Sequence, residues 1–222
     1  MITRRLVPVL LLLPLACARL PAITPKDGAF SPETGKALEA CRIFPEGTWQ
    51  FLHSIRAEMP GGRSFIMMGL TIMSSRLQTH RSVIMTLEGF VIFDGEYDRG
   101  IIVHRALPPF DSPHFAGGLM QDIRLVFFEP EGPVVAFGEL KDGSVVRRHQ
   151  ASDGSTVDVE ALPDRDWRIR HYSPSQRLTR TVRALHAGGG PSGFPATIEL
   201  TACGDHSYSL VMTLVEAVQI EP

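Results

Sequence analysis

Short runs in which apolar and polar residues alternate repeat along most of the chain after Thr48. A period of two is typical of β-strands that bury one face. The Asp94-Gly95 pair predicts a tight hairpin, with the return strand over 100–107. Strands do not alternate regularly with helices, so the pattern disfavours a doubly wound α/β fold. It predicts a mainly β protein with roughly ten antiparallel strands.

One segment in the middle of the chain departs from this period. Between residues 113 and 128 the apolar side chains recur at every fourth position: Phe115, Leu119, Ile123 and Phe127. This spacing predicts an amphipathic helix. Ser112 is suited to cap its N-terminus, and Pro113 suits the first helical position. A short apolar run over 134–140 predicts a second helix.

The N-terminus has the layout of a secretory signal peptide. Arg4 and Arg5 precede an apolar run over 6–16, which is much shorter than the ~20 residues needed to span a bilayer. Two cleavage sites compete. The residues that end at Cys17 resemble a bacterial lipobox, which would make Cys17 the lipidated first residue, whereas cleavage after Ala18 would release the chain into the periplasm. We favour the lipoprotein, with a signal peptide over 1–17.

The segment that follows is rich in proline and glycine, so residues 18–40 are expected to form a flexible tether before a folded domain over 41–222. Export brings the chain into an oxidising compartment, where disulfides persist. With Cys17 lipidated or removed, Cys41 and Cys203 remain as one pair, and we expect them to form a disulfide. The alternative is two separate buried thiols.

Charge and motifs exclude several classes of function. The chain has 22 Lys+Arg against 24 Asp+Glu, a net charge of −2, whereas nucleic-acid binders usually carry a basic excess. Eight histidines are scattered without metal-ligand spacing. The stretch 188–193 formally fits G-x-G-x-x-G, but Phe194-Pro195 follows where a dinucleotide site needs a helix, so it is interpreted as a hairpin loop. We therefore expect no catalytic residue, no metal, no cofactor and no nucleic-acid partner.

The helical segment FAGGLMQDIRLVFFEP carries a resemblance to a known family. Its Leu119, Asp122, Leu125 and Pro130 are similar to a Leu-x-x-Asp-x-x-Leu segment in bacterial outer-membrane lipoproteins related to LolB. The preceding MTLEGFVIFDGEYDRG and the late Tyr208-Ser209-Leu210 also resemble strands of that family. The resemblance covers about residues 40–220. It implies a LolA/LolB-like fold: an antiparallel sheet of about 10–11 strands curled into an unclosed half-barrel, with helix over the open side and acyl chains bound on the concave face.

The expected lipid site follows from combining this fold with the sequence pattern. One wall is the apolar stripe of the helix: Phe115, Leu119, Ile123 and Phe127. The facing strand is expected to present Ile66, Met68, Leu70 and Ile72, although a shift of one residue would present Phe65, Met67 and Met73 instead. LolB also carries a protruding loop with an exposed apolar residue, for which residues 108–113 with Phe110 at the tip are the candidate here.

Two hypotheses for function remain open. The first is an outer-membrane lipoprotein on the periplasmic face, anchored through Cys17, that binds acyl chains of a lipid or a lipoprotein. The second is a structural or accessory envelope lipoprotein, whose barrel is filled by its own side chains and which acts through a protein partner. An apolar cavity of several hundred Å³ would distinguish the first from the second.

Overall fold

The computed structural model describes residues 19–25, 43–186, 193–204 and 207–220. The predicted signal peptide, Cys17, Cys41 and most of the glycine-rich stretch 188–193 lie outside these residues. Within the described part of the chain, no helix is both long and apolar enough to cross a membrane.

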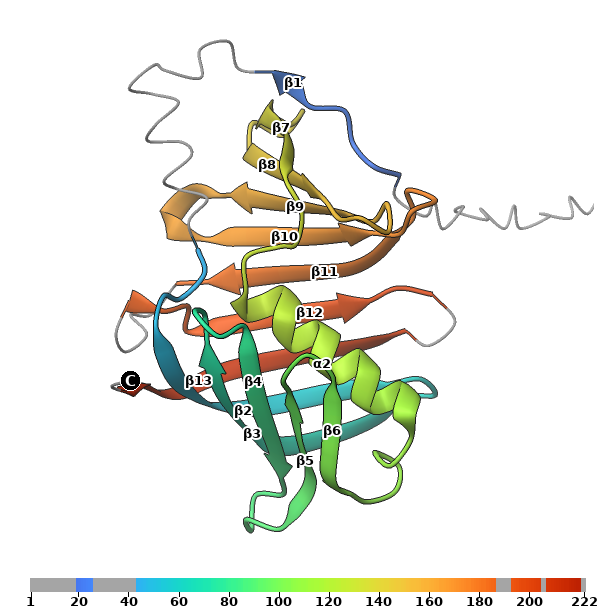
Figure 1. Cartoon of the computed structure of the whole chain (residues 1–222), viewed down its shortest axis with the longest axis vertical. Helices are drawn as coiled ribbons and strands as arrows, with labels where there is room; N and C mark the ends of the chain where they lie inside the picture. The colour runs from blue at the N-terminus through green and yellow to red at the C-terminus, as the bar shows by residue number, and fades with distance from the viewer. Residues whose placement is uncertain (1–18, 26–42, 187–192, 205–206, 221–222) are drawn as a thin grey trace, which may run out of the picture.

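The fold is one antiparallel sheet with a helix on its concave side (Figure 1). The sheet has 13 strands in the order β1-β7-β8-β9-β10-β11-β12-β13-β2-β3-β4-β5-β6. The strands are β1 (Thr24–Pro25), β2 (Thr48–Met59), β3 (Arg63–Ser74), β4 (Thr79–Met85), β5 (Val91–Tyr97), β6 (Ile101–Ala106), β7 (Val134–Glu139), β8 (Val145–Gln150), β9 (Thr156–Ala161), β10 (Trp167–Tyr172), β11 (Leu178–Leu185), β12 (Thr197–Ala202) and β13 (Tyr208–Ile220). A 3₁₀ turn, η1, covers Pro163–Arg165.

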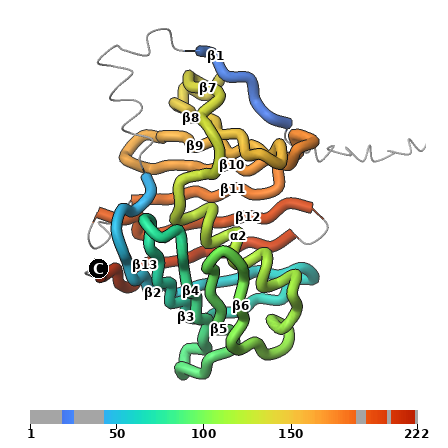
Figure 2. Tube along the Cα trace, in the orientation of Figure 1, coloured from blue at the N-terminus to red at the C-terminus, as the bar shows by residue number. Residues whose placement is uncertain are grey.

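The two halves of the chain are joined by the pairing of β13 with β2. The ladder runs from Ile220 opposite Thr48 to Ser209 opposite Glu58, so the end of the chain lies beside its first long strand (Figure 2). β1 and β6 remain the two edges of the sheet. The prediction of a mainly β, curled and unclosed sheet is therefore confirmed, with 13 strands in place of the 10–11 expected.

The predicted helix is confirmed as α2, Pro113–Phe127, with Pro113 at its first position. The backbone N–H of Phe115 donates to the Ser112 hydroxyl at 3.1 Å, which satisfies one of the free N–H groups at the helix start. The helix lies across the sheet (Figure 1). Its buried residues include Met120, Ile123 and Phe127, which attach it to the core of the half-barrel.

The second predicted helix is wrong: Val134–Glu139 forms β7, between β1 and β8. A short apolar run looks the same as a buried strand or as one face of a helix, so periodicity could not separate them. The predicted hairpin at Asp94-Gly95 is also wrong, because both residues lie inside β5. A side chain at Gly95 would come within 3.0 Å of the Met120 Cε atom. Glycine is needed there for the close approach of α2, not for a turn.

Aromatic side chains close one end of the half-barrel. Phe51, near the start of β2, stacks on Phe127 of α2 with ring centroids 4.9 Å apart. Phe194 packs edge-on against Phe51 at 5.0 Å and against Trp49 at 4.8 Å. Such contacts combine a large buried area with favourable ring geometry. We call these four residues the aromatic plug.

The described part of the predicted tether is docked on the body of the protein. Thr24 and Pro25 form β1, which pairs with Glu139 and Gly138 at the edge of β7. The carbonyl oxygen of Pro21 accepts a hydrogen bond from Arg148 at 2.9 Å. Residues 19–25 therefore form a strap, and we use that name for them below.

Candidate functional site

A largely apolar cavity of about 540 Å³ lies between the first half of α2 and the ends of β2, β3 and β13. Its apolar lining residues are Ile55, Ala57, Met59, Pro60, Phe65, Met67, Ile84, Pro109, Phe110, Phe115, Leu119 and Leu210. The volume falls within the ~300–1,000 Å³ typical of small-molecule sites. We call this space the apolar cavity.

The predicted helix stripe divides into two parts. Phe115 and Leu119 line the apolar cavity. Ile123 and Phe127, each 7% exposed, are instead packed in the core beyond it. The first two turns of α2 thus form a wall of the cavity, and the later turns seal it.

The predicted face of β3 was wrong by one residue. Phe65 and Met67 line the cavity, and Met73 is buried in the core. Ile66 is 59% exposed, and Met68, Leu70 and Ile72 lie on the same outer face, each only partly buried. Both faces of this strand are apolar, so its sequence does not show which one turns inward, and a shift of one residue exchanges the faces.

Phe110 does not form the tip of a protruding loop, as the resemblance implied. It is 8% exposed, and its ring packs against Phe115 at 4.9 Å and Phe65 at 6.4 Å. Apolar partners on both α2 and β3 are close enough to bury it, so it forms part of the cavity wall.

A buried polar cluster stands at the inner end of the apolar cavity. Asp122, on the sheet-facing side of α2, accepts a hydrogen bond from the Nε atom of Arg180 at 2.9 Å. It also accepts one from the Tyr208 hydroxyl, and the Arg180 guanidinium lies 5.6 Å from the Tyr208 ring centroid. Asp122 matches the acidic position of the helix motif, but the sequence did not show its partners, which are 58 and 86 residues away.

Burial governs the protonation of this cluster. It raises the pKa of Asp122, although the bonds from Tyr208 and Arg180 act in the opposite direction. Burial and the neighbouring Asp122 carboxylate together raise the pKa of Tyr208. Tyr208 therefore stays protonated and donates to Asp122, while Arg180 supplies the positive charge.

A second cavity, of about 650 Å³, lies on the other side of this cluster. Asp122 and Arg180 border both spaces. The second cavity is lined by the later turns of α2 and by β9–β11, and it includes polar side chains: Gln121, Arg124, Glu129, Ser152, Asp153, His171 and Thr179. The cluster therefore lies between a largely apolar space and one whose lining is more mixed.

Neither cavity presents an obvious catalytic or metal-binding arrangement. Among the described residues, no three His, Cys, Asp or Glu side chains gather as they would around a metal ion. Cys203 borders the apolar cavity and is exposed. Its predicted partner, Cys41, lies outside the described residues, so the disulfide stays a prediction.

Comparison with known proteins finds solved structures with a similar fold. A crystal structure of a LolA superfamily protein from Nitrosomonas europaea superimposes with a TM-score of 0.55, at 15% identity, over 85% of this chain and 94% of that one. The chain has a LolA-like fold. A putative outer-membrane lipoprotein-sorting protein domain from Vibrio parahaemolyticus gives a TM-score of 0.46 at 8% identity, over 83% of this chain and 89% of that one. No family model matches the sequence, and no curated protein matches it either.

The LolA-like fold confirms the architecture implied by the helix motif. At 15% identity the likeness extends to the fold alone, because one fold can serve many functions. The function must therefore be argued from the cavity of this chain.

Proposed function

We propose that this protein is a non-enzymatic lipoprotein of the outer membrane, on its periplasmic face, which binds acyl chains of a lipid or a lipoprotein for transport or insertion in the cell envelope. The observation that carries the proposal is the apolar cavity of about 540 Å³. A barrel filled by its own side chains would not leave such a space, so the cavity favours a carrier over a purely structural lipoprotein.

The chemistry of the walls suits a flexible hydrocarbon chain. Met59 and Met67 have unbranched, polarisable side chains that adapt to ligands of varied shape. Each methylene transferred from water into the cavity would contribute about 0.8 kcal/mol. Binding of this kind needs neither a catalytic group nor a cofactor.

The test is binding of a fluorescent fatty acid to the exported chain with Cys17→Ser. Met67→Trp should weaken binding at least about tenfold, equivalent to ~1.4 kcal/mol, because the added ring occupies the cavity. Met68→Trp is the matched control, since Met68 lies on the outer face of the same strand, and it should leave binding unchanged.

A second variant changes polarity instead of volume. Leu119→Asp places a charge without a partner in an apolar site, and it should abolish probe binding. Circular dichroism of each variant separates loss of binding from loss of fold. If the folded wild-type chain does not retain the probe, the carrier proposal fails, and the structural lipoprotein takes its place.

A further inference from the structure

We propose that the mouth of the apolar cavity faces the membrane that holds the Cys17 anchor, because the strap fixes the anchor at the mouth end of the sheet. The inference rests on the proposed lipidation of Cys17 and adds an orientation to it. The partner is the surface of a phospholipid bilayer.

The cavity is closed at one end of β2 and opens at the other. The aromatic plug packs around Phe51, near the strand's start. The cavity lining instead follows the strand toward its end, through Ile55 and Met59 to Pro60 in the next turn. Pro60 and Cys203 are exposed lining residues at this open end. We call this end the mouth.

The register of the ladders aligns several strand ends at the mouth. β2 ends beside the start of β13, where Glu58 pairs with Ser209. β12 ends beside the start of β11, where Ala202 pairs with Arg180. The turn between β10 and β11 follows at the same edge, because Tyr172 pairs with Leu178. In Figure 1 the ends of β2, β10 and β12 all lie on the right-hand side.

The strap begins at this same edge. Arg19 forms an antiparallel bridge with Arg177, in the turn between β10 and β11. From there the strap passes Arg148, which bonds to the Pro21 carbonyl, and ends as β1 on β7. In Figure 1 it runs from the right-hand side up to β7. Both of its ends are therefore fixed to the sheet.

The strap begins close in sequence to the proposed anchor. Cys17 precedes Arg19 by two residues, and two extended residues reach at most about 7 Å. A diacylated Cys17 would thus hold the β10–β11 turn close to the bilayer, with the ends of β2 and β12 at the same edge. Lipid could then enter the cavity from the bilayer without a long path through water.

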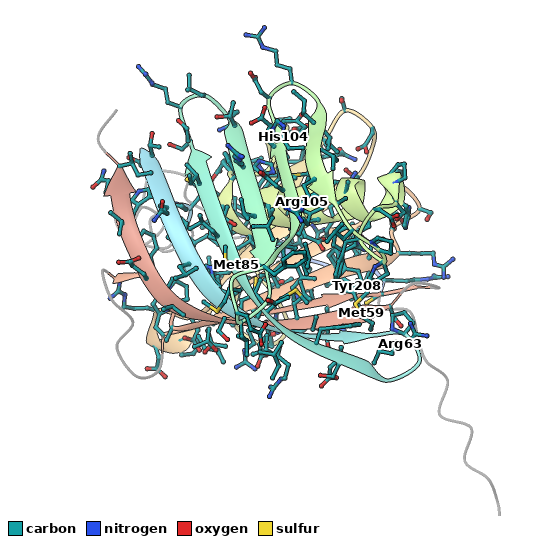
Figure 3. The ribbon with its side chains drawn as sticks, turned by 90° about the horizontal axis from the view of Figure 1, so that it is seen from below. Met59, Arg63, Met85, His104, Arg105 and Tyr208 are labelled. Atoms are coloured by element: carbon teal, nitrogen blue, oxygen red, sulfur yellow. The ribbon has the colours of Figure 1, made fainter. Side chains whose placement is uncertain are left out.

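The exposed surface at this end carries charges of both signs. Arg63 and Arg177 are basic, and Glu58 and Asp153 are acidic. Figure 3 shows Met59, Arg63 and Tyr208 near one another and apart from His104. Such a mixed rim is compatible with phospholipid headgroups, and Arg63 is a suitable reporter position because it is exposed and does not line the cavity.

The experiment compares lipid contact at the two ends of β3. The full chain is expressed in a Gram-negative envelope with a photo-crosslinking amino acid in place of Arg63, at the mouth, or in place of Leu77, which is 63% exposed in the turn beyond the other end of β3. After irradiation of the membrane fraction, phospholipid adducts are counted by mass spectrometry. We expect several-fold more adduct at position 63 than at position 77, because only position 63 lies at the mouth.

A variant that loosens the strap at β1 shows whether this attachment helps to set the orientation. A Cβ atom at Gly138 would clash with the Thr24 carbonyl oxygen, so Gly138→Ala should displace β1 and reduce the asymmetry. Gly100→Ala is the matched control, because a Cβ there meets nothing within 4 Å. Adducts formed with lipid carried in the cavity would persist in Gly138→Ala, which distinguishes them from bilayer contact.

Equal labelling at the two positions, more labelling at position 77, or a chain found only in the soluble periplasmic fraction would overturn the proposed orientation. An asymmetry that Gly138→Ala leaves unchanged would overturn the role of the β1 attachment. Failure of the proposed function gives a different result. In that case the wild-type chain does not bind the fatty-acid probe, but the crosslinking asymmetry remains.

Discussion

The Nε atom of Arg180 on β11 donates to the carboxylate of Asp122 on α2 across 2.9 Å, and the pair stands between the apolar cavity and the second cavity. The side chains are 23% and 7% exposed. Removal of two charges from water is costly, and their attraction repays it only in part. The contact therefore contributes more to the position of α2 on the sheet than to the free energy of folding.

The two members of this pair should respond unequally to replacement. Asp122→Leu leaves Arg180 charged and half-buried, and guanidinium cannot lose its proton. We expect a loss of about 3 kcal/mol in the free energy of unfolding, near the lower end for a broken buried pair because Arg180 retains some exposure. Arg180→Met should cost less, since burial already raises the pKa of Asp122 and the carboxyl group can become neutral. Urea unfolding measures both losses.

The double variant Asp122→Leu/Arg180→Met removes both charges and should recover most of the loss. The exposed pair Arg81–Asp94, with side chains 49% and 18% exposed, is the control, and its single variants should lose much less. Two results would contradict this interpretation of the pair. The first is an equal loss of unfolding free energy in Asp122→Leu and Arg180→Met, and the second is a loss in the double variant that equals the sum of the two single losses.

His80 should make the fold sensitive to acid. Its ring stacks on Tyr97 at 5.5 Å, and within the described residues neither ring nitrogen has a hydrogen-bond partner. Burial, and secondarily the charge of Arg124, lowers the pKa of His80 from 6.5 to about 4. The unfolded chain therefore takes up a proton before the folded one does, and stability falls as the pH drops from about 6.5 toward 4.

His80→Phe tests this effect. Phenylalanine keeps the ring contacts and removes two buried polar atoms, so the variant should be more stable at neutral pH and lose less stability on acidification. Thermal melts at a series of pH values measure both changes. His53, whose pKa burial also lowers to about 4, leaves part of the acid sensitivity in place. An unchanged pH profile would show that His80 is not buried as described.

Gly95 should be intolerant of a side chain because α2 presses on β5 at that position. A Cβ atom there would lie 2.9 Å from the Phe93 ring and 3.0 Å from Met120 Cε. Gly95→Val should cost about 1–3 kcal/mol through overpacking. Met120→Ala in the same chain should relieve part of that cost. Calorimetry of the single and double variants, with Gly100→Ala as an open-space control, would detect the coupling, and its absence would argue against this packing.

The disulfide between Cys41 and Cys203 is predicted independently of the cavity. It follows from the export of the chain and from the single pair of cysteines that remains once Cys17 is set aside. A bridge that closes a loop of about 160 residues would stabilise the fold by about 4–5 kcal/mol in the chain-entropy model. Peptide mapping of the alkylated, unreduced protein should detect a linked pair of peptides. Alkylation of both thiols without prior reduction would remove the bridge.

Sequence reasoning succeeded where one local signal dominated. The fourfold spacing from Phe115 to Phe127, with Ser112 as its cap, located α2 to within one residue. Alternation identified a mainly β protein with antiparallel strands, which the ladders confirm, whereas the curled, unclosed form of the sheet was implied by the family resemblance. Even so, alternation could not predict the short strand at the edge of the sheet. β1 has two residues and carries no periodic signal.

The failures come from contacts between distant parts of the chain. Phe65 and Met67 face the cavity because of how β3 pairs with β2 and β4, and an apolar run such as FIMMGLTIM contains no such information. Phe110 is buried between Phe115 and the remote Phe65 of β3, and the sequence does not show the contact with Phe65. The partners of Asp122 are equally remote in sequence.

Native mass spectrometry of the protein purified from the envelope would show whether the apolar cavity holds acyl chains, on which the proposed carrier function depends. We expect a wild-type population whose mass exceeds that of the chain by one lipid, released on organic extraction. That population should be lost in Met67→Trp and retained in Met68→Trp. A folded wild-type protein that carries no lipid, and takes none up from added fatty acid, would contradict the proposed function.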